Sequence, residues 1–259
     1  MYSMAAPHAK GKSAEDNIFA ANNRAIALAE KIGTENVVNA TVGSILDEDG
    51  SLVVLDVVKE ALSALTPKEM CAYAPIQGYR AFLDACIDQC FGKSRPEGYI
   101  DACSTPGGTG VLHHVVHNYS EVGDEVLISD WHWGAYDSLI DDNNRKVRTF
   151  SLLTEDGHFH AADFKEKVED ILSRQDNIVI ILNGIANNPT GYCLSDEEWQ
   201  AAIDVLKEAV KDETKKAILV PDVAYLDYSG EKEECRRFFR LFGGLPKNIL
   251  TVCAYTLSK

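Results

Sequence analysis

Apolar residues follow two alternating spacings along most of the chain, and this alternation predicts the fold class. Short continuous apolar runs are typical of strands buried on both faces, and apolar residues three or four positions apart mark one face of a helix. Strands are predicted over residues 37–41, 125–130, 146–151, 177–183, 217–221 and 248–254. Helices are predicted from a cap at Ser13 to Gly33 and over residues 55–64, 79–91, 108–119, 134–142, 162–173 and 196–212. The pattern indicates an α/β fold, with a mostly parallel central sheet and helices on both faces.

The clearest predicted helix covers residues 196–212. Ser195 and Glu198 have the spacing of a capping box at its start. A charged segment near the C-terminal end, residues 231–237, is expected to be a solvated helix face. The apolar positions of helix 196–212 form one expected buried stripe: Trp199, Ala202, Ile203, Leu206, Ala209 and Val210.

Composition and charge limit the cellular compartment and the classes of partner that are expected. The 259 residues are 46% hydrophobic, as in ordinary globular proteins, and 40 acidic against 25 basic residues give a formal charge of −15. A surface this acidic repels phosphate backbones, so nucleic acid is not an expected partner. No apolar stretch approaches the ~20 residues that span a bilayer, and the N-terminal residues lack a secretory apolar segment. With seven cysteines and no CxxC pair, a cytoplasmic protein with unpaired thiols is expected.

Polar and ionisable residues follow three of the predicted strands at the point where each strand ends. Asn188 follows one of them, Asp222 and Tyr225 follow the next along the chain, and Thr256 and Lys259 follow the last. In open α/β sheets, ligands bind outside the carboxyl ends of the strands. These side chains are therefore expected to converge on one site.

Each residue type suits a separate task. Gly108 and Thr109 open a predicted helix, where free backbone N–H groups and the helix dipole favour a phosphate. An amine such as that of Lys259 can bond covalently to an aldehyde cofactor. A carboxylate such as Asp222 can keep a ring nitrogen protonated, and an aromatic side chain such as Trp133 can stack on the ring. Singly these signals are weak, but their order and combination are specific.

Six segments carry a family resemblance in this order: CAYAPIQGYRAF, STPGGTGVL, SDWHWGAYDS, NGIANNPTGY, VPDVAYLDY and AYTLSK. Together they resemble class I aminotransferases of the aspartate/aromatic subgroup, which have pyridoxal-phosphate (PLP) fold type I. The resemblance covers roughly residues 36–259. It implies an N-terminal arm and part of a smaller α/β domain in residues 1–50, and a large PLP-binding domain in residues 51–259.

The resemblance also implies that the large domain is incomplete at its C-terminal side. The family places an arginine for the cofactor phosphate, and another for the substrate carboxylate, beyond the position of Lys259. The chain is therefore expected to be a fragment of a polypeptide of about 400 residues. Residues 1–259 made alone are expected to be inactive and poorly folded.

Catalytic and ring-binding roles follow from the same resemblance. Lys259 resembles the Schiff-base lysine, which also shuttles protons, and Asp222 resembles the partner of the pyridine nitrogen. Tyr225 and Asn188 are implied to contact the phenolate oxygen of the ring, and Trp133 to stack on it. Trp133 and Asn188 are also implied to contact substrate.

The remaining implied roles concern the phosphate, the substrate and the partner subunit. Gly108, Thr109 and Thr256 are implied to hold the cofactor phosphate. Tyr73 resembles the tyrosine that reaches the phosphate of the neighbouring subunit, which implies a homodimer with shared active sites. Gly43 resembles a glycine whose loop closes over the substrate.

The function implied is transfer of an amino group between a 2-amino acid of aspartate or aromatic type and a 2-oxo acid such as 2-oxoglutarate. A PLP-dependent β-lyase would keep every residue named, and a non-catalytic PLP-fold binding or regulatory protein is a third reading. A nucleotide-binding Rossmann domain fits worse, because no GxGxxG follows a first strand. A metal site is not expected, because His113 and His117 share a predicted helix face without a third ligand.

Overall fold

The computed structural model describes residues 4–10 and 17–259, and the chain divides into two compact units, Met1–Tyr73 and Ala74–Lys259. The predicted helix cap at Ser13 lies outside the described residues. The predicted domain boundary between residues 50 and 51 falls inside the first unit, and the roles assigned to the two domains stay predictions. Among the described residues, no helix combines the length and the apolar character needed to cross a membrane.

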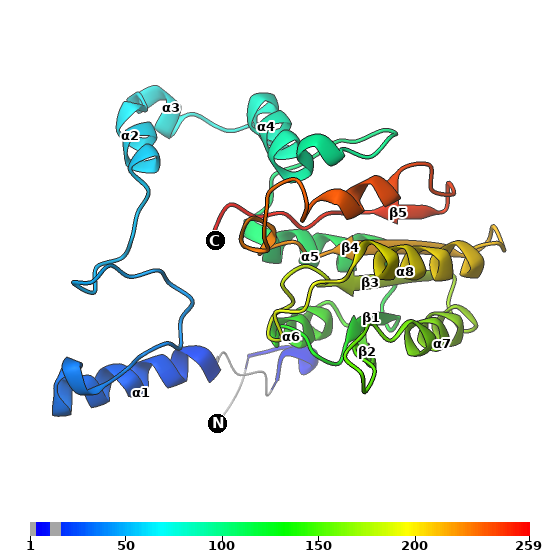
Figure 1. Ribbon diagram of the computed structural model, residues 1–259, viewed down its shortest axis with the longest axis horizontal. Helices are drawn as coiled ribbons and strands as arrows, with labels where there is room; N and C mark the ends of the chain where they lie inside the picture. The colour runs from blue at the N-terminus through cyan, green and yellow to red at the C-terminus, as the bar shows by residue number, and fades with distance from the viewer. Residues whose placement is uncertain (1–3, 11–16) are drawn as a thin grey trace. The chain divides into compact units, whose positions relative to one another are not determined.

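A five-stranded parallel sheet forms the centre of the unit Ala74–Lys259 (Figure 1). The strand order is β2-β1-β3-β4-β5, so the chain starts inside the sheet and builds outward in both directions. The register is regular, with Val126 of β1 beside Val179 of β3. This arrangement confirms the predicted fold class. The strands are β1 (Glu125–Ser129), β2 (Lys146–Phe150), β3 (Asn177–Leu182), β4 (Lys216–Pro221) and β5 (Ile249–Thr251).

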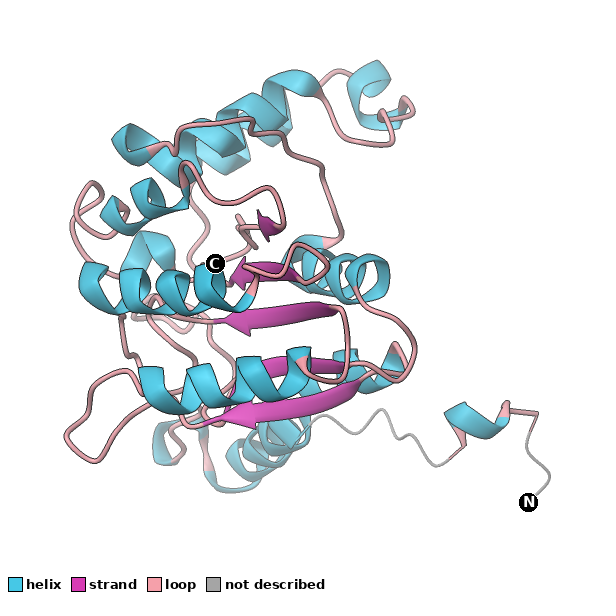
Figure 2. Ribbon diagram, turned by 90° about the vertical axis from the view of Figure 1, so that its right-hand side faces the viewer, coloured by secondary structure: helices cyan, strands magenta, loops and turns pink. Residues whose placement is uncertain are grey.

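Helices cover both faces of this sheet, as Figure 2 shows. The helices of the unit are α4 (Arg80–Phe91), α5 (Gly107–Tyr119), α6 (Ala135–Asp142), α7 (Ala161–Leu172) and α8 (Asp196–Ala209), with short 3₁₀ turns η3 (Gly92–Ser94), η4 (Leu226–Tyr228) and η5 (Arg237–Phe242). Each of the five helices lies where the sequence predicts one.

The core has two layers because successive side chains of a strand point to opposite faces. In β3, Ile178 and Ile180 pack with α7 and α8, whereas Val179 and Ile181 pack with α5 and α6. The side chains on both faces of β3 are fully buried. This is why its sequence is a continuous apolar run rather than an alternation of apolar and polar residues.

Helix α8 begins as its sequence predicts. Ser195 Oγ accepts a hydrogen bond from the Glu198 backbone N–H at 3.2 Å, and Glu198 Oε2 accepts one from the Ser195 N–H at 2.8 Å. This capping box satisfies two backbone donors that a helix start otherwise leaves free. The buried face of the helix comprises Trp199, Ala202, Ile203 and Leu206.

The prediction of a solvated helix face over residues 231–237 was right for the exposure of Glu231, Glu234 and Arg237 but wrong for the helix and for Arg236. Residues 231–236 form turns that lead into η5, and the Arg236 side chain is fully buried. Its Nε donates to the backbone oxygens of Gln89 at 3.2 Å and Cys90 at 3.0 Å, near the end of α4. These acceptors and an ion pair with Asp227 compensate for the burial of the charge.

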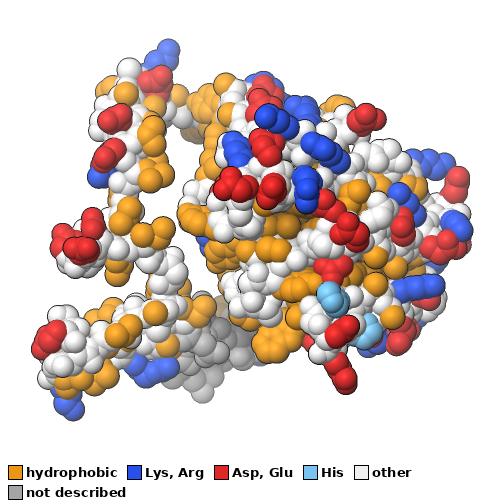
Figure 3. All heavy atoms as spheres, viewed as in Figure 1, with side chains coloured by type: hydrophobic (Ala, Val, Ile, Leu, Met, Phe, Trp, Pro, Cys, Tyr) orange, Lys and Arg blue, Asp and Glu red, His pale blue; other side chains and the backbone are white. Residues whose placement is uncertain are grey.

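The unit Met1–Tyr73 contains helices but no buried core among its described residues. None of the side chains whose burial is described up to Tyr73 is buried, and Figure 3 shows hydrophobic side chains on the open surfaces of the α1 and α2 segments. The predicted strand 37–41 was wrong: these residues have no strand partner, and Val38 is almost fully exposed. The elements are η1 (Pro7–Ala9), α1 (Asn17–Ile32), η2 (Thr34–Asn36), α2 (Asp56–Ala64) and α3 (Pro67–Cys71).

Candidate active site

A hollow of about 130 Å³ lies at the carboxyl edge of the sheet. The starts of α5 and α6 and the segments that follow β3, β4 and β5 contribute its walls. It therefore occupies the place where parallel α/β sheets bind ligands. The lining residues are Gly108, Thr109, Leu112, Trp133, Tyr136, Asn183, Asn188, Asp222, Ala224, Tyr225, Thr256, Ser258 and Lys259. Every site residue predicted from the unit Ala74–Lys259 is among them.

Asp222 lies at the floor of this hollow, directly after β4, with 8% of its surface exposed. Burial raises the pKa of its carboxyl above the usual value. Hydrogen bonds from the Tyr136 hydroxyl and the Ala224 backbone N–H, and the positive charge of Lys259, act in the opposite direction. A carboxylate desolvated in this way is stabilised by a nearby cation, such as a protonated ring nitrogen.

Tyr136 and Asn183 also line the site, although no sequence motif singles them out. The Tyr136 hydroxyl donates to Asp222 Oδ2 at 2.5 Å, and burial followed by the Asp222 charge raises the pKa of that phenol. Asn183 Nδ2 donates to the Asp222 backbone oxygen at 2.8 Å, and Asn183 Oδ1 accepts from the Asn188 N–H at 2.6 Å. Asn183 thus fixes the ends of β3 and β4 together. The signal available was a polar residue closing an apolar strand.

The glycine-rich start of α5 forms one side of the hollow. Gly107 has φ +67°, a left-handed conformation that side chains disfavour, and it directs the chain into the helix. A methyl group on Gly108 would lie 3.8 Å from Thr256 Cβ, so the helix start adjoins the segment after β5. On that segment the hydroxyls of Thr256 and Ser258 lie 2.8 Å apart. Backbone donors and two hydroxyls at a helix N-terminus suit a phosphate group.

Lys259 brings its amine to the same hollow. Its Nζ lies 5.1 Å from the centroid of the Tyr225 ring. Trp133 lines the same hollow, where its ring meets Tyr136 edge to face with centroids 5.8 Å apart. An amine, a phenol, a buried carboxylate and an aromatic face thus surround one small volume.

The residues present fit pyridoxal phosphate. The α5 start offers donors for a phosphate, Asp222 offers a carboxylate for a pyridine nitrogen, and Lys259 offers an amine for an aldehyde. Within residues 4–10 and 17–259, no cluster of three His, Cys, Asp or Glu side chains is arranged to hold a metal ion.

Gly43 and Tyr73 belong to the unit Met1–Tyr73. Gly43 has open space where a side chain would be, and the Tyr73 side chain is fully exposed. Their predicted roles at the substrate and at a neighbouring subunit's phosphate stay predictions.

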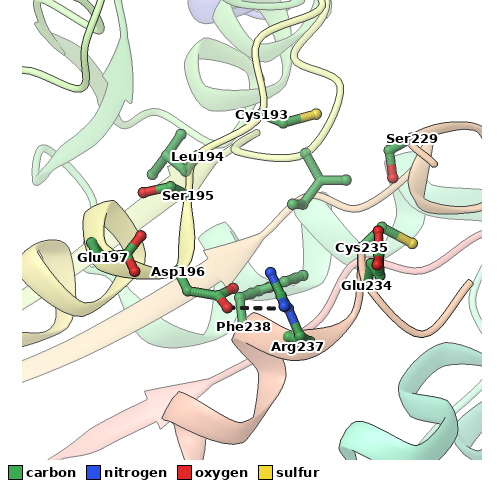
Figure 4. Close-up of a pocket in the computed structure, with 11 residues that line it drawn as sticks. Cys193, Leu194, Ser195, Asp196, Glu197, Ser229, Glu234, Cys235, Arg237 and Phe238 are labelled. Carbon is green, nitrogen blue, oxygen red and sulfur yellow. Dashed lines mark ion pairs between the residues drawn. The ribbon is translucent and has the colours of Figure 1, made fainter. Parts of the chain in front are cut away.

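A second hollow, of about 210 Å³, lies elsewhere in the same unit (Figure 4). Arg237 and Asp196 form an ion pair at 3.3 Å among its lining residues, and Glu197 and Glu234 add further acidic groups. None of the predicted site residues lines it. It is the larger of the two hollows, but it lacks the amine and the glycine-rich helix start of the first.

The chain belongs to the class I and II aminotransferase family. The sequence profile of that family, described as aminotransferase class I and II, matches residues 35–259. The chloroplastic aspartate aminotransferase of Arabidopsis thaliana is 31% identical over 212 residues, covering 79% of this chain and 45% of that protein. The aromatic-amino-acid aminotransferase of Pseudomonas aeruginosa is 28% identical over 223 residues, covering 81% of this chain and 52% of that protein. The chain spans about half the length of these relatives.

A solved structure supports the same assignment. The crystal structure of an aminotransferase from Anaerococcus prevotii superposes with a TM-score of 0.95 at 38% sequence identity. The match covers 100% of this chain and 63% of that chain. The family resemblance stated from the six segments is therefore confirmed, and so is the expected fold.

Proposed function

We propose that this protein is a pyridoxal-phosphate-dependent aminotransferase that transfers an amino group between a 2-amino acid and a 2-oxo acid. Aspartate or an aromatic amino acid is the proposed donor, and 2-oxoglutarate the proposed acceptor. The names of the relatives support this substrate class. The observation that carries the proposal is the convergence of Lys259, buried Asp222 and the glycine-rich start of α5 on one hollow.

The bound cofactor would supply an electron sink for negative charge that develops at the substrate Cα. Asp222 would hold the ring nitrogen protonated, which its buried position and its bond from Tyr136 favour. Lys259 Nζ would carry the proton to and from the substrate Cα. Tyr225 and Asn188 would donate hydrogen bonds to the ring phenolate oxygen.

Binding and orientation would fall to the remaining lining residues. Gly108 and Thr109 at the α5 start, with Thr256 opposite them, would hold the phosphate. Trp133 would stack on the ring and, with Asn188, would contact the substrate. These interactions would fix the reacting bond relative to the ring, which is the positioning effect that intramolecular reactions exploit.

The partner and the location are also part of the proposal. We infer a homodimer in which Tyr73 of one subunit reaches the phosphate of the other, and in which the Gly43 loop covers the substrate. We infer a cytoplasmic enzyme of amino-acid metabolism and biosynthesis. All seven cysteines, each within the described part of the chain, are free, as is usual in a reducing compartment.

The test is a set of half-reactions on the natural polypeptide that carries residues 1–259 (the full chain), loaded with pyridoxal phosphate. Aspartate, tyrosine, phenylalanine and glutamate are each added without an acceptor. Stoichiometric conversion of the cofactor to its amine form, with release of the matching 2-oxo acid, is the expected result. An S-alkylcysteine, which carries a thiolate leaving group on Cβ, is added as a fifth substrate; release of the thiol, pyruvate and ammonia from it without that conversion would indicate a β-lyase. Binding of pyridoxal phosphate without any reaction would indicate a non-catalytic protein.

A further inference from the structure

Asp227 occupies an unusual position between the two segments that bring reactive groups to the hollow. It follows Tyr225 by two residues, at the start of η4. Its Oδ2 accepts a hydrogen bond at 3.0 Å from the hydroxyl of Tyr255, the residue directly before Thr256. One carboxylate therefore joins the segment after β4 to the segment after β5.

The same carboxylate is fixed to the body of the unit by Arg236. The Arg236 guanidinium, which is fully buried, forms an ion pair with Asp227 Oδ1. Its other donors reach the backbone oxygens of Gln89, Cys90 and Lys232, so all three of its nitrogens are used. Arg236 therefore holds one carboxylate oxygen of Asp227 in place, and Tyr255 donates to the other.

The Tyr255 hydroxyl is held as the donor in this bond. Partial burial, and then the bond and charge of Asp227, raise the pKa of the phenol. The Tyr255 ring also packs against the α7 and α8 side of the core, which leaves its hydroxyl directed at Asp227. Thr256, Ser258 and Lys259 follow within four residues of this anchor.

We propose that Asp227 and Tyr255 are positioning residues that hold the Lys259 segment against the Tyr225 segment. Neither side chain lines the hollow. They act through the backbone that carries Thr256 and Lys259 on one side and Tyr225 on the other. This inference rests on the proposed function, because it concerns the placement of cofactor-binding groups.

The test compares Tyr255→Phe with the unchanged full chain. A hydrogen bond to a charged acceptor contributes enough that its loss is expected to weaken pyridoxal phosphate binding ~10-fold. The pH at which the visible absorption of the lysine-bound cofactor changes should also shift, because Lys259 is no longer held in one position. The melting temperature of the cofactor-free form should stay within about 4 °C of the unchanged protein.

Two neighbouring residues supply matched controls. Tyr228→Phe removes a hydroxyl from a tyrosine beside Asp227 that is 58% exposed, and it should leave cofactor affinity and the absorption titration unchanged. Arg237→Met removes the guanidinium that pairs with Asp196 in the second hollow (Figure 4), next to Arg236 in the chain, and it should do the same.

A double-variant cycle sharpens the result. If Tyr255 acts through Asp227, the effect of Tyr255→Phe should shrink in an Asp227→Asn background. Independent, additive effects would overturn the proposal, as would an unchanged cofactor affinity and absorption titration in Tyr255→Phe. Failure of the unchanged protein to bind pyridoxal phosphate would instead overturn the proposed function, so the two failures are distinguishable.

Discussion

Both units of the chain have apolar residues at helical spacing, but the unit Ala74–Lys259 buries them and the unit Met1–Tyr73 leaves them exposed. Leu182 in β3 is 0% exposed, whereas Leu62 in α2 is 62% exposed. The hydrophobicity pattern assigns both leucines to an element, a strand for Leu182 and a helix for Leu62, and does not show which of them is buried. Periodicity therefore predicts an element, whereas burial depends on the presence of a packing partner.

The two units should differ most in the loss of unfolding free energy when one leucine in each is replaced by alanine. Leu182→Ala should lower the free energy of unfolding by about 2–5 kcal/mol, because it leaves a cavity in a close-packed core. Leu62→Ala should change it by less than about 0.5 kcal/mol, as for other exposed positions. Urea unfolding curves of the two variants measure both. A comparable loss in Leu62→Ala would show that α2 is covered in solution.

The next largest effect concerns the buried carboxylate of the sheet unit. Asp222→Asn should lower turnover by at least ~10²-fold, equivalent to ~2.7 kcal/mol, because a neutral amide cannot stabilise a protonated ring nitrogen. Steady-state kinetics measure it. Asp204→Asn, on the exposed face of α8, is the control and should retain normal turnover. Near-normal turnover in Asp222→Asn would refute the charge role.

Asp222→Asn should also change how the stability of the cofactor-free protein depends on pH. Burial raises the folded-state pKa of Asp222 above its usual value of 3.8, so the folded state keeps this proton at a pH where the unfolded state has lost it. Stability from this group is therefore full below pH 3.8 and falls as pH rises through the folded pKa. Cofactor-free Asp222→Asn should lose less stability over this range than the unchanged protein. Parallel pH profiles would contradict this.

A smaller effect compares two helix caps of the same type. Ser195 caps α8 in the sheet unit, and Thr66 caps α3 with an equivalent capping box in the other unit. Ser195→Ala should cost about 1 kcal/mol in unfolding experiments, because α8 packs on the core. Thr66→Ala should leave the global transition unchanged, since α3 has no buried residue. Equal losses would show that α3 unfolds together with the sheet unit.

The fold of the sheet unit could be predicted from the sequence because local and tertiary preferences agree there. Strand β3 is apolar throughout since it is covered on both faces, and α8 carries both its cap and its buried stripe. The predicted strand 37–41 failed because a strand needs a neighbour for its backbone hydrogen bonds, and a hydrophobicity pattern does not reveal one. Arg236 was misjudged for a related reason. Two of its acceptors, the backbone oxygens of Gln89 and Cys90, lie on α4, 147 and 146 positions earlier in the chain.

The sequence predicted the site residues whose own side chain or backbone performs the chemistry. It did not predict residues that act by supporting another residue. Lys259, Asp222 and Gly108 stand at strand ends or a helix start, and the structure gathers them at one hollow. Tyr136 and Asn183 support Asp222 from a helix face and a strand end. Their partners are set by the fold, so a sequence pattern alone does not single them out.

Lys259 is the residue proposed to hold the cofactor covalently, and borohydride reduction tests this assignment. The full chain is loaded with pyridoxal phosphate, reduced and digested, and the labelled peptide is identified by mass spectrometry. We expect a label on Lys259, and loss of the cofactor's visible absorption in Lys259→Ala. A label on any other lysine, or an unchanged spectrum in Lys259→Ala, would contradict it.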